Sequence, residues 1–246
     1  MGRIGKIFIG TSGWSYSHWR GPFYPENISG DQLLNYYLQH FRSVEINTTF
    51  YHLPDKKTLE HWAETAPKGF VFTVKASRYI THMKKLKDPG ASTGELFKRI
   101  TALGNKLGPI LFQLPPRWKY NQERFRDFLR SLSREFRYTF EFRDRSWINP
   151  QALELLSQYR SAFCIYELDG FVSPKEVTTD FVYIRLHGPN GPYQGSYSQK
   201  ALSGWAGAIT AWQNQGLSTY CYFDNDEAGY AAGNAQTLQT MLASTQ

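Results

Sequence analysis

Short apolar runs alternate with longer amphipathic stretches along the whole chain. The apolar runs have the length of single strands, whereas residues 33–41 and 202–212 repeat apolar side chains at helical spacing. Eight alternating strand and helix units, with no linker between them, predict one domain over residues 1–246, a single (β/α)8 TIM-type barrel with parallel strands. The predicted strands cover residues 6–10, 43–47, 70–75, 109–116, 138–143, 162–167, 181–188 and 219–226.

Signals at the ends of the predicted helices support this organisation. Asp55, Asn121 and Asn149 can each cap the start of a helix. The sixth unit differs, because residues 168–179 leave room only for a short turn around Pro174. No glycine-rich dinucleotide fingerprint follows the first strand, so the pattern favours a barrel over an open sheet and predicts no dinucleotide cofactor.

Polar side chains recur at alternate positions in six of the predicted strands, so within each strand they share one face. In a barrel the apolar face of a strand packs against the helices, and the opposite face points into the interior. The polar residues would therefore form a ring at the carboxyl ends of the strands, where barrel enzymes keep their active sites. The ring comprises Glu45, Asn47, Lys75, Gln113, Glu141, Arg143, Arg185, His187 and Asp224.

The ring favours a functional site at the mouth of the barrel. Burying many charges costs free energy unless each one is paired, and a barrel that needed only stability could fill these positions with Val, Ile and Leu. The alternative interpretation is a self-satisfied ionic network that binds no ligand.

The composition limits the environment and the partners of the chain. The 246 residues are 41% hydrophobic and 20% charged, which is typical of a globular protein. No apolar run approaches the roughly 18 residues of a membrane span, so a soluble, cytoplasmic protein without membrane partners is predicted. Cys164 and Cys221 lie in apolar stretches and are interpreted as buried core residues in a reducing compartment. The formal net charge of +7 favours anionic partners weakly.

Seven ordered motifs cover nearly the whole chain. They lie at residues 9–26, 44–54, 72–82, 107–116, 141–147, 180–188 and 222–235, and include "VEINTTFYHLP", "EFRDRSW" and "YFDNDEAGYAAGNA". In these motifs the chain resembles the YecE-like family, domain of unknown function seventy-two. The resemblance implies a TIM-type barrel and a shared site at the strand ends, without implying a particular reaction.

The cationic members of the ring predict an anion site. Arg143 and Arg185 can act as forks for a phosphate, and Lys75 can add a point charge. A glycine-rich loop at residues 188–192 follows the seventh strand, where barrels often hold a phosphate. We therefore expect an enzyme that binds an anionic, phosphate-bearing substrate at the carboxyl end of the barrel and uses hydrolase-like acid/base chemistry.

The candidate site residues divide into two groups by their chemistry. The predicted catalytic residues are Glu45, Glu141, His187 and Asp224. The predicted substrate-binding residues are Asn47, Lys75, His82, Gln113, Arg143 and Arg185, together with Trp14 and Trp147 from loops near the mouth. Lys75 could also act as a Schiff-base nucleophile, although an ion pair with Glu45 or Glu141 is the favoured expectation.

Three other functions stay open at this point. The four predicted catalytic residues could hold a divalent cation in a metal-assisted phosphodiesterase or endonuclease-like hydrolase, although the sequence selects no metal ligand set. Glu45 and Glu141 could form a glycosidase pair, but the usual glycosidase positions after the fourth and seventh strands hold Gln113 and Arg185. A non-catalytic barrel could bind nucleic acid or another ligand, and steep salt dependence would identify nucleic-acid binding.

Overall fold

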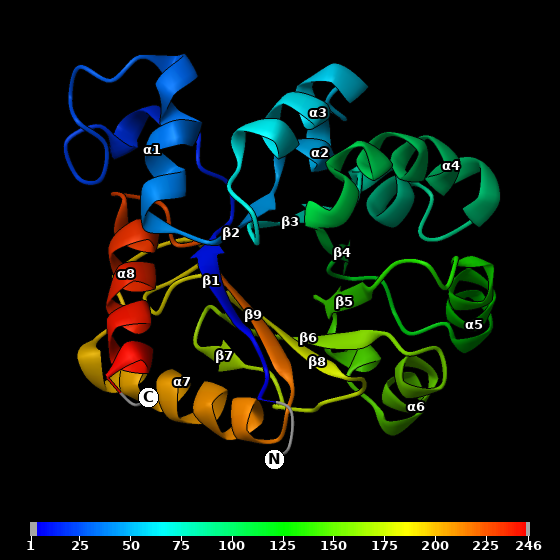
Figure 1. The fold of residues 1–246 in the computed structure, drawn as a ribbon. Helices are drawn as coiled ribbons and strands as arrows, with labels where there is room; N and C mark the ends of the chain where they lie inside the picture. The colour runs from blue at the N-terminus through cyan, green and yellow to red at the C-terminus, as the bar shows by residue number, and fades with distance from the viewer. Residues whose placement is uncertain (1–3, 245–246) are drawn as a thin grey trace.

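In a computed structural model that describes residues 4–244, eight parallel strands form a nearly closed barrel (Figure 1). They follow one another around the barrel in the order β1, β9, β8, β6, β5, β4, β3 and β2. The predicted (β/α)8 architecture is confirmed, and every predicted strand is present. The strands are β1 (Ile7–Thr11), β2 (Ser43–Ile46), β3 (Val71–Lys75), β4 (Leu107–Leu114), β5 (Tyr138–Phe142), β6 (Ala162–Leu168), β8 (Phe181–Leu186) and β9 (Ser218–Phe223).

The helices lie around the outside of the barrel (Figure 1). Asp55, Asn121 and Asn149 cap three of them as predicted, since each side chain accepts a hydrogen bond from a backbone N–H three residues later. The helices are α1 (Leu33–His40), α2 (Thr48–Tyr51), α3 (Lys56–Thr65), α4 (Pro89–Ile100), α5 (Gln122–Ser131), α6 (Pro150–Gln158), α7 (Gln199–Asn214) and α8 (Tyr230–Ala243). Short 3-10 helices cover Ser17–Trp19, Gly30–Gln32, Thr101–Lys106 and Arg145–Trp147, and a π-helix, η3, covers Tyr79–Met83.

The sixth unit has no helix between its strands, as predicted. A two-residue strand, β7 (Phe171–Val172), pairs antiparallel with the end of β6. The turn between them lies at Asp169 and Gly170 rather than around Pro174, because both residues have the positive φ that a two-residue hairpin requires.

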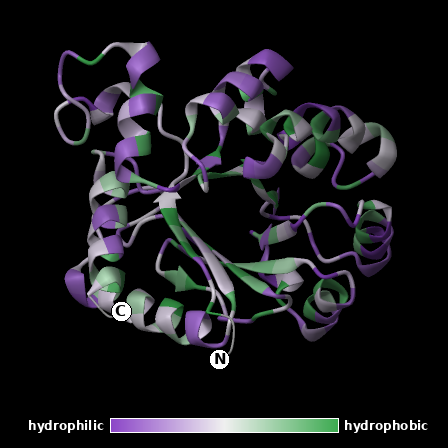
Figure 2. Cartoon of the chain, in the orientation of Figure 1, coloured by the Kyte–Doolittle hydropathy of each residue, from purple (hydrophilic) through white to green (hydrophobic). Residues whose placement is uncertain are grey.

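The alternation of side chains along the strands separates an outer core from an inner one. Phe140 faces outward and packs against Phe125 of α5, with ring centres 5.2 Å apart. Leu111, Tyr183 and Tyr222 face inward and fill the barrel. Figure 2 shows mainly apolar strands and helices that carry many hydrophilic residues. Both cysteines are buried and free, as predicted.

The barrel closes between β1 and β2 through few backbone contacts. Gly13 N–H donates to Glu45 O at 2.8 Å. Below this point the Tyr37 hydroxyl of α1 accepts from Thr11 N–H at 2.9 Å and donates to Ser43 O at 3.1 Å. A side chain thus bridges two strands where a ladder bond would otherwise lie. No helix within residues 4–244 is long and apolar enough to cross a bilayer.

Candidate functional site at the carboxyl ends of the strands

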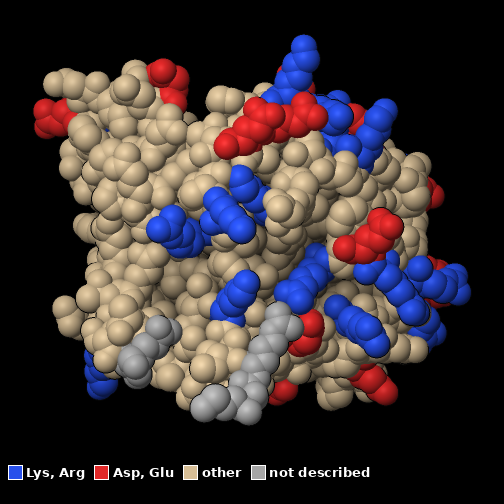
Figure 3. Space-filling model, viewed as in Figure 1, with Lys and Arg blue, Asp and Glu red and all other residues tan. Residues whose placement is uncertain are grey.

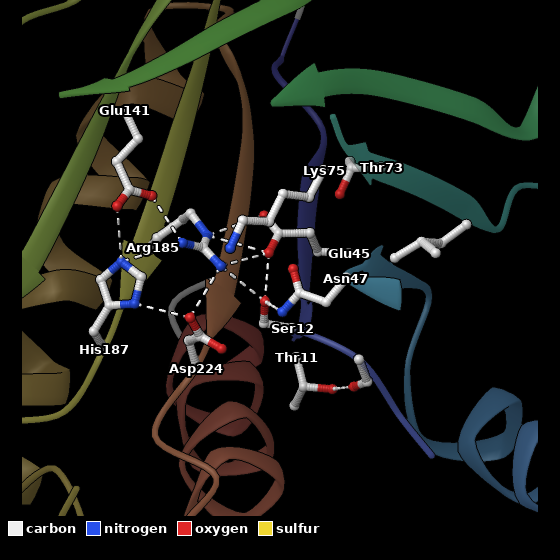
Figure 4. A network of polar contacts seen from close by, with 12 residues as sticks. Thr11, Ser12, Glu45, Asn47, Thr73, Lys75, Glu141, Arg185, His187 and Asp224 are labelled. Atoms are coloured by element: carbon white, nitrogen blue, oxygen red, sulfur yellow. Dashed lines mark hydrogen bonds and ion pairs between the residues drawn. The ribbon is translucent and has the colours of Figure 1, made fainter. Parts of the chain in front are cut away.

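Arg185 lies at the centre of the polar residues inside the barrel and has no exposed surface (Figure 4). Its Nη2 atom lies 2.7 Å from Glu45 Oε1 and 3.0 Å from Asp224 Oδ2. Its Nη1 atom lies 2.8 Å from Glu141 Oε2, and Nη2 also donates to Ser12 Oγ at 2.9 Å. One buried cation of β8 therefore joins side chains at the ends of β1, β2, β5 and β9.

His187 forms a second junction between two of these carboxylates. Its Nδ1 lies 2.9 Å from Asp224 Oδ2, and because an ionised carboxylate can only accept, Nδ1 carries the proton. Its Nε2 lies 3.3 Å from Glu141 Oε1 and 3.1 Å from Arg143 Nη2. Asp224 therefore fixes the orientation of the imidazole, as the orienting carboxylate does in a catalytic triad.

The neighbouring cations keep two of the carboxyl groups ionised. Burial opposes ionisation of Glu141, yet Arg143 and Arg185 hold its pKa well below the usual range. Burial also opposes ionisation of Asp224, but Arg185 and then His187 lower its pKa to about 2. Both groups are anions at neutral pH, so any proton donor in this cluster is another side chain.

Glu45 is fully buried and both of its carboxylate oxygens are bonded. The Tyr183 hydroxyl donates to Oε2 at 2.6 Å, and Ser12 Oγ donates to Oε1. Sequence reasoning missed both donors, although the same alternation identifies them. Tyr183 lies two residues before Arg185 on the inner face of β8, and Ser12 lies just beyond β1, two residues after Gly10.

Lys75 ends β3 and is only 8% exposed, but it forms no ion pair. No carboxylate oxygen of the described chain lies within 4.0 Å of its Nζ, which corrects the expected pair with Glu45 or Glu141. Nζ lies 4.3 Å from the centre of the Phe50 ring. Burial, and then the charge of Arg185, lowers the pKa of Lys75 to about 8.

Two amide side chains on either side of β3 carry an oxygen without a hydrogen-bond donor in the described chain. Gln113 on β4 is 7% exposed and its Oε1 is unpaired. Asn47 follows β2, and its Oδ1 is unpaired while its Nδ2 donates to Ser12 Oγ at 2.5 Å. A buried acceptor without a donor costs about 1–3 kcal/mol, which a hydroxyl or amine of a ligand would recover.

His82 lies in the π-helix that follows β3 and is half-buried. Its ring packs edge to face on Phe50, with ring centres 5.1 Å apart. Burial, and then the charges of Lys75, Arg78 and Arg143, lowers its pKa to about 4. The imidazole is therefore neutral at pH 7, because burial first and then the neighbouring cations oppose its protonation.

Three predicted binding residues are enclosed by the protein. Arg185 is bonded on all three guanidinium nitrogens, which corrects its expected role as a direct clamp on a substrate anion. Trp147 is fully buried and donates from Nε1 to Trp118 O at 2.5 Å. Trp14 packs edge to face on Trp62, with ring centres 4.8 Å apart. The two predicted tryptophans therefore stabilise the outer core and the loops, and Trp147 has no free face for a ligand.

The glycine-rich loop at residues 188–192 folds back on the segment that follows it. Gly188 N–H donates to the Tyr197 hydroxyl at 3.0 Å. A Cβ atom at Gly188 would lie 2.2 Å from Gln194 O, and the residue has a φ of +112°. Close packing therefore requires this glycine, and phosphate binding by the loop stays a prediction.

The residues considered as alternative metal ligands surround a guanidinium group. Arg185 lies between Glu45, Glu141 and Asp224 and bonds to all three (Figure 4). Within residues 4–244, no group of three or more His, Cys, Asp or Glu side chains is arranged to hold a metal ion. As arranged, this donor set fits Arg185 rather than a divalent cation.

Comparisons with known proteins agree with this architecture. The model of the family described as "Protein of unknown function DUF72" matches residues 8–246. UPF0759 protein YunF of Bacillus subtilis is 27% identical over 269 residues, which cover 96% of this chain and 94% of YunF. UPF0759 protein YecE of Escherichia coli is 31% identical over 138 residues, or 56% of this chain and 48% of YecE. The crystal structure of a DUF72 family protein from Thermotoga maritima superimposes with a TM-score of 0.87 at 29% identity, covering 97% of this chain and 99% of that one.

Proposed function

Because this chain belongs to the DUF72 family and carries a polar site at the mouth of its barrel, we propose that it is an enzyme acting on an anionic, phosphate-bearing substrate. The observation that carries this proposal is the buried ammonium of Lys75, which has no carboxylate partner within 4.0 Å in the described chain. A buried charge without a partner costs several kcal/mol. An anionic group of a ligand would supply the missing partner.

The electrostatic environment of the mouth supports the same conclusion. Lys75, Arg78 and Arg143 all depress the pKa of His82, so their fields add at this point. The three carboxylates of the interior are bonded to Arg185 and do not neutralise Lys75 through direct contact. An anion that reaches the mouth would meet cations first.

Two buried amide oxygens without a hydrogen-bond donor among the described residues indicate which other groups the substrate carries. Gln113 Oε1 and Asn47 Oδ1 flank β3 and can each accept a hydrogen bond from a hydroxyl group. A small molecule with a phosphate at one end and hydroxyl groups near it would satisfy the cations and both acceptors. The site therefore suits a phosphorylated, hydroxylated metabolite.

His187 is the candidate group for acid/base chemistry. Asp224 accepts from its Nδ1, and the fully buried Nε2 faces Arg143, Arg185 and Glu141, so proton exchange with a substrate would need a shift of these side chains. After such a shift Nε2 can take or return a proton while Asp224 holds the ring and stabilises the imidazolium. Glu45 and Arg185 would then hold the neighbouring charged side chains in position rather than contact the substrate.

A thermal-melt panel of phosphorylated metabolites tests the proposal. A ligand that binds only the native state at about 100 times its Kd stabilises the protein by about 2.7 kcal/mol. We expect such a shift for the wild type and a much smaller one for Arg143→Gln, because Arg143 follows β5 at the mouth and its side chain retains 8% exposure. The matched control is Arg130→Gln, since Arg130 is 72% exposed on α5 and should not alter binding. An equal shift in the wild type and both variants would show that the anion does not bind at Arg143.

A second candidate, nucleic-acid binding, has one observation in its favour. Tyr51, Tyr79 and Met83 are exposed on α2 and η3 beside the mouth, and Lys84 lies over the Tyr79 ring at 5.7 Å. Figure 3 shows basic side chains gathered in the middle of the viewed face and mixed with acidic ones over α4 and α5. Short oligonucleotides in the same panel separate the two candidates, because nucleic-acid binding weakens steeply with salt.

A further inference from the structure

We propose that Lys75 is a covalent catalyst whose Nζ forms an imine with a carbonyl carbon of the substrate. This proposal rests on the proposed function and narrows its substrate class to phosphorylated aldehydes and ketones. Lys75 ends β3 with its side chain on the inner face, as Figure 4 shows beside Arg185 and Glu45. Its amine donates no hydrogen bond to any group of the described chain, so it is available to an incoming carbon atom.

The surroundings of Lys75 raise the share of the neutral amine, although the ammonium ion stays the major form at pH 7. Desolvation and a neighbouring cation are the two ways in which proteins activate a lysine nucleophile, and both are present here. Phe50 covers one side of Nζ, and Arg185 adds a positive charge, whereas Glu45, Glu141 and Asp224 act in the opposite direction. With a pKa of about 8, about one molecule in ten carries the neutral amine at pH 7.

The remaining groups of the mouth match the needs of such a substrate. Arg143 can bind the phosphate, because it bonds to Glu141 and His187 through only part of its guanidinium group. Gln113 lies on the neighbouring strand two residues beyond Leu111, which is the register partner of Lys75. The unpaired Oε1 of Gln113 therefore lies on the inner face, nearer the mouth than Lys75, where it can accept from a substrate hydroxyl.

The proposed step balances without an oxidant or a reductant. The lone pair of Nζ attacks the carbonyl carbon, a C–N bond forms, and the π electrons of the carbonyl pass to its oxygen. The oxygen takes two protons in total and leaves as water while the C=N bond forms. Overall, an ammonium and a carbonyl compound give a protonated imine and one water molecule, so the two protons lost from nitrogen equal the two gained by oxygen. The protonated imine then withdraws electrons from the adjacent carbon.

Reductive trapping tests the proposal directly. The wild type would be incubated with dihydroxyacetone phosphate or pyruvate and sodium borohydride, followed by peptide mapping by mass spectrometry. We expect one adduct, on Lys75, with at least tenfold higher occupancy than on Lys84, whose partly exposed ammonium pairs with Asp88 at 3.3 Å. Labelling of Lys84 without labelling of Lys75 would overturn the proposal.

The variant Lys75→Arg separates covalent catalysis from anion binding. It keeps the positive charge but cannot form an imine, so the adduct should vanish while dihydroxyacetone phosphate still shifts the melting temperature. A thermal shift in the wild type without an adduct on Lys75 would overturn the imine and leave the anion site intact. An adduct with pyruvate, but no shift with any phosphorylated compound, would support the imine and contradict the proposed phosphate-bearing substrate. If Lys75→Arg does not fold, the peptide map of the wild type alone shows whether Lys75 forms the imine.

Discussion

At the scale of single residues, Arg185 is the common partner of the three buried carboxylates of the site. It bonds to Glu45, Glu141 and Asp224 with no exposed surface, so its removal would leave three carboxylates without their common partner. We expect Arg185→Leu to lower the free energy of unfolding by about 3–5 kcal/mol, because a buried charge without its partner keeps its desolvation cost. Urea denaturation of the two proteins at pH 7 measures the difference.

The control for this prediction is Arg130→Leu. Arg130 pairs with Asp127 on the surface of α5, and an exposed pair contributes about 0–1 kcal/mol. A loss in Arg185→Leu no larger than in this control would contradict the assignment of Arg185 as the common partner.

The pairing of charges within the ring could not be predicted from the sequence. Strand alternation correctly assigned residues such as Glu45 and Arg185 to the inner face, because the two-residue period depends on the backbone alone. Which cation reaches which carboxylate depends on the height of each side chain in the barrel and on its length. Arg185 reaches across the interior, and Lys75 consequently has no carboxylate left within contact distance.

At the scale of elements, α1 closes the barrel through one hydroxyl group. The Tyr37 hydroxyl bridges Thr11 N–H and Ser43 O, and a Cβ atom at Gly10 would lie 2.0 Å from the same carbonyl oxygen. We expect Tyr37→Phe to lower the free energy of unfolding by about 1–3 kcal/mol, because it leaves two buried backbone groups unpaired. Amide hydrogen exchange of Thr11 should also become faster.

Tyr36→Phe is the matched control, since Tyr36 is the neighbouring, half-buried tyrosine of the same helix. Its ring packs on Tyr24 and His40, and these contacts do not need the hydroxyl. If Tyr36→Phe costs as much as Tyr37→Phe, the bridge between β1 and β2 does not explain the loss.

Elements with a long, regular pattern were predictable, and short ones were not. The eight barrel strands follow from runs of alternating side chains, and the capped helices follow from their first residues. The strand β7 has two residues and the π-helix η3 has five, which is too short for any period to appear. The position of His82 at the mouth depends on that π-helix, so its neighbours could not be inferred from spacing.

At the scale of the whole molecule, the burial of His82 beside the cations of the mouth makes stability depend on pH. The pKa of His82 is about 4 in the folded protein and about 6.5 in an unfolded chain, so the unfolded state binds more protons between these values. The free energy of unfolding should therefore fall as the pH is lowered from 6.5 to 4. We expect His82→Gln to lose this dependence, measured from urea midpoints at pH 4.5 and 6.5.

His61→Gln serves as the control, because His61 lies exposed on α3, away from the cations of the mouth. It should keep the pH dependence of the wild type. The same fall in stability in His82→Gln would assign the effect to other groups. At lower pH a second loss is expected as Asp224, with a pKa of about 2 against 3.8 unfolded, gains its proton.

The sharing of Arg185 among three strands has a consequence for how this protein can evolve. Glu45, Glu141 and Asp224 share the single positive charge of Arg185, so replacing one carboxylate removes a partner of the arginine, and replacing the arginine leaves three buried carboxylates without it. Each single substitution therefore gives a destabilised protein, whereas a paired change on two strands distant in sequence preserves the net charge of the set. Glu45 and Arg185 are 140 positions apart, so substitutions at these two sites should be found together among descendants of this chain.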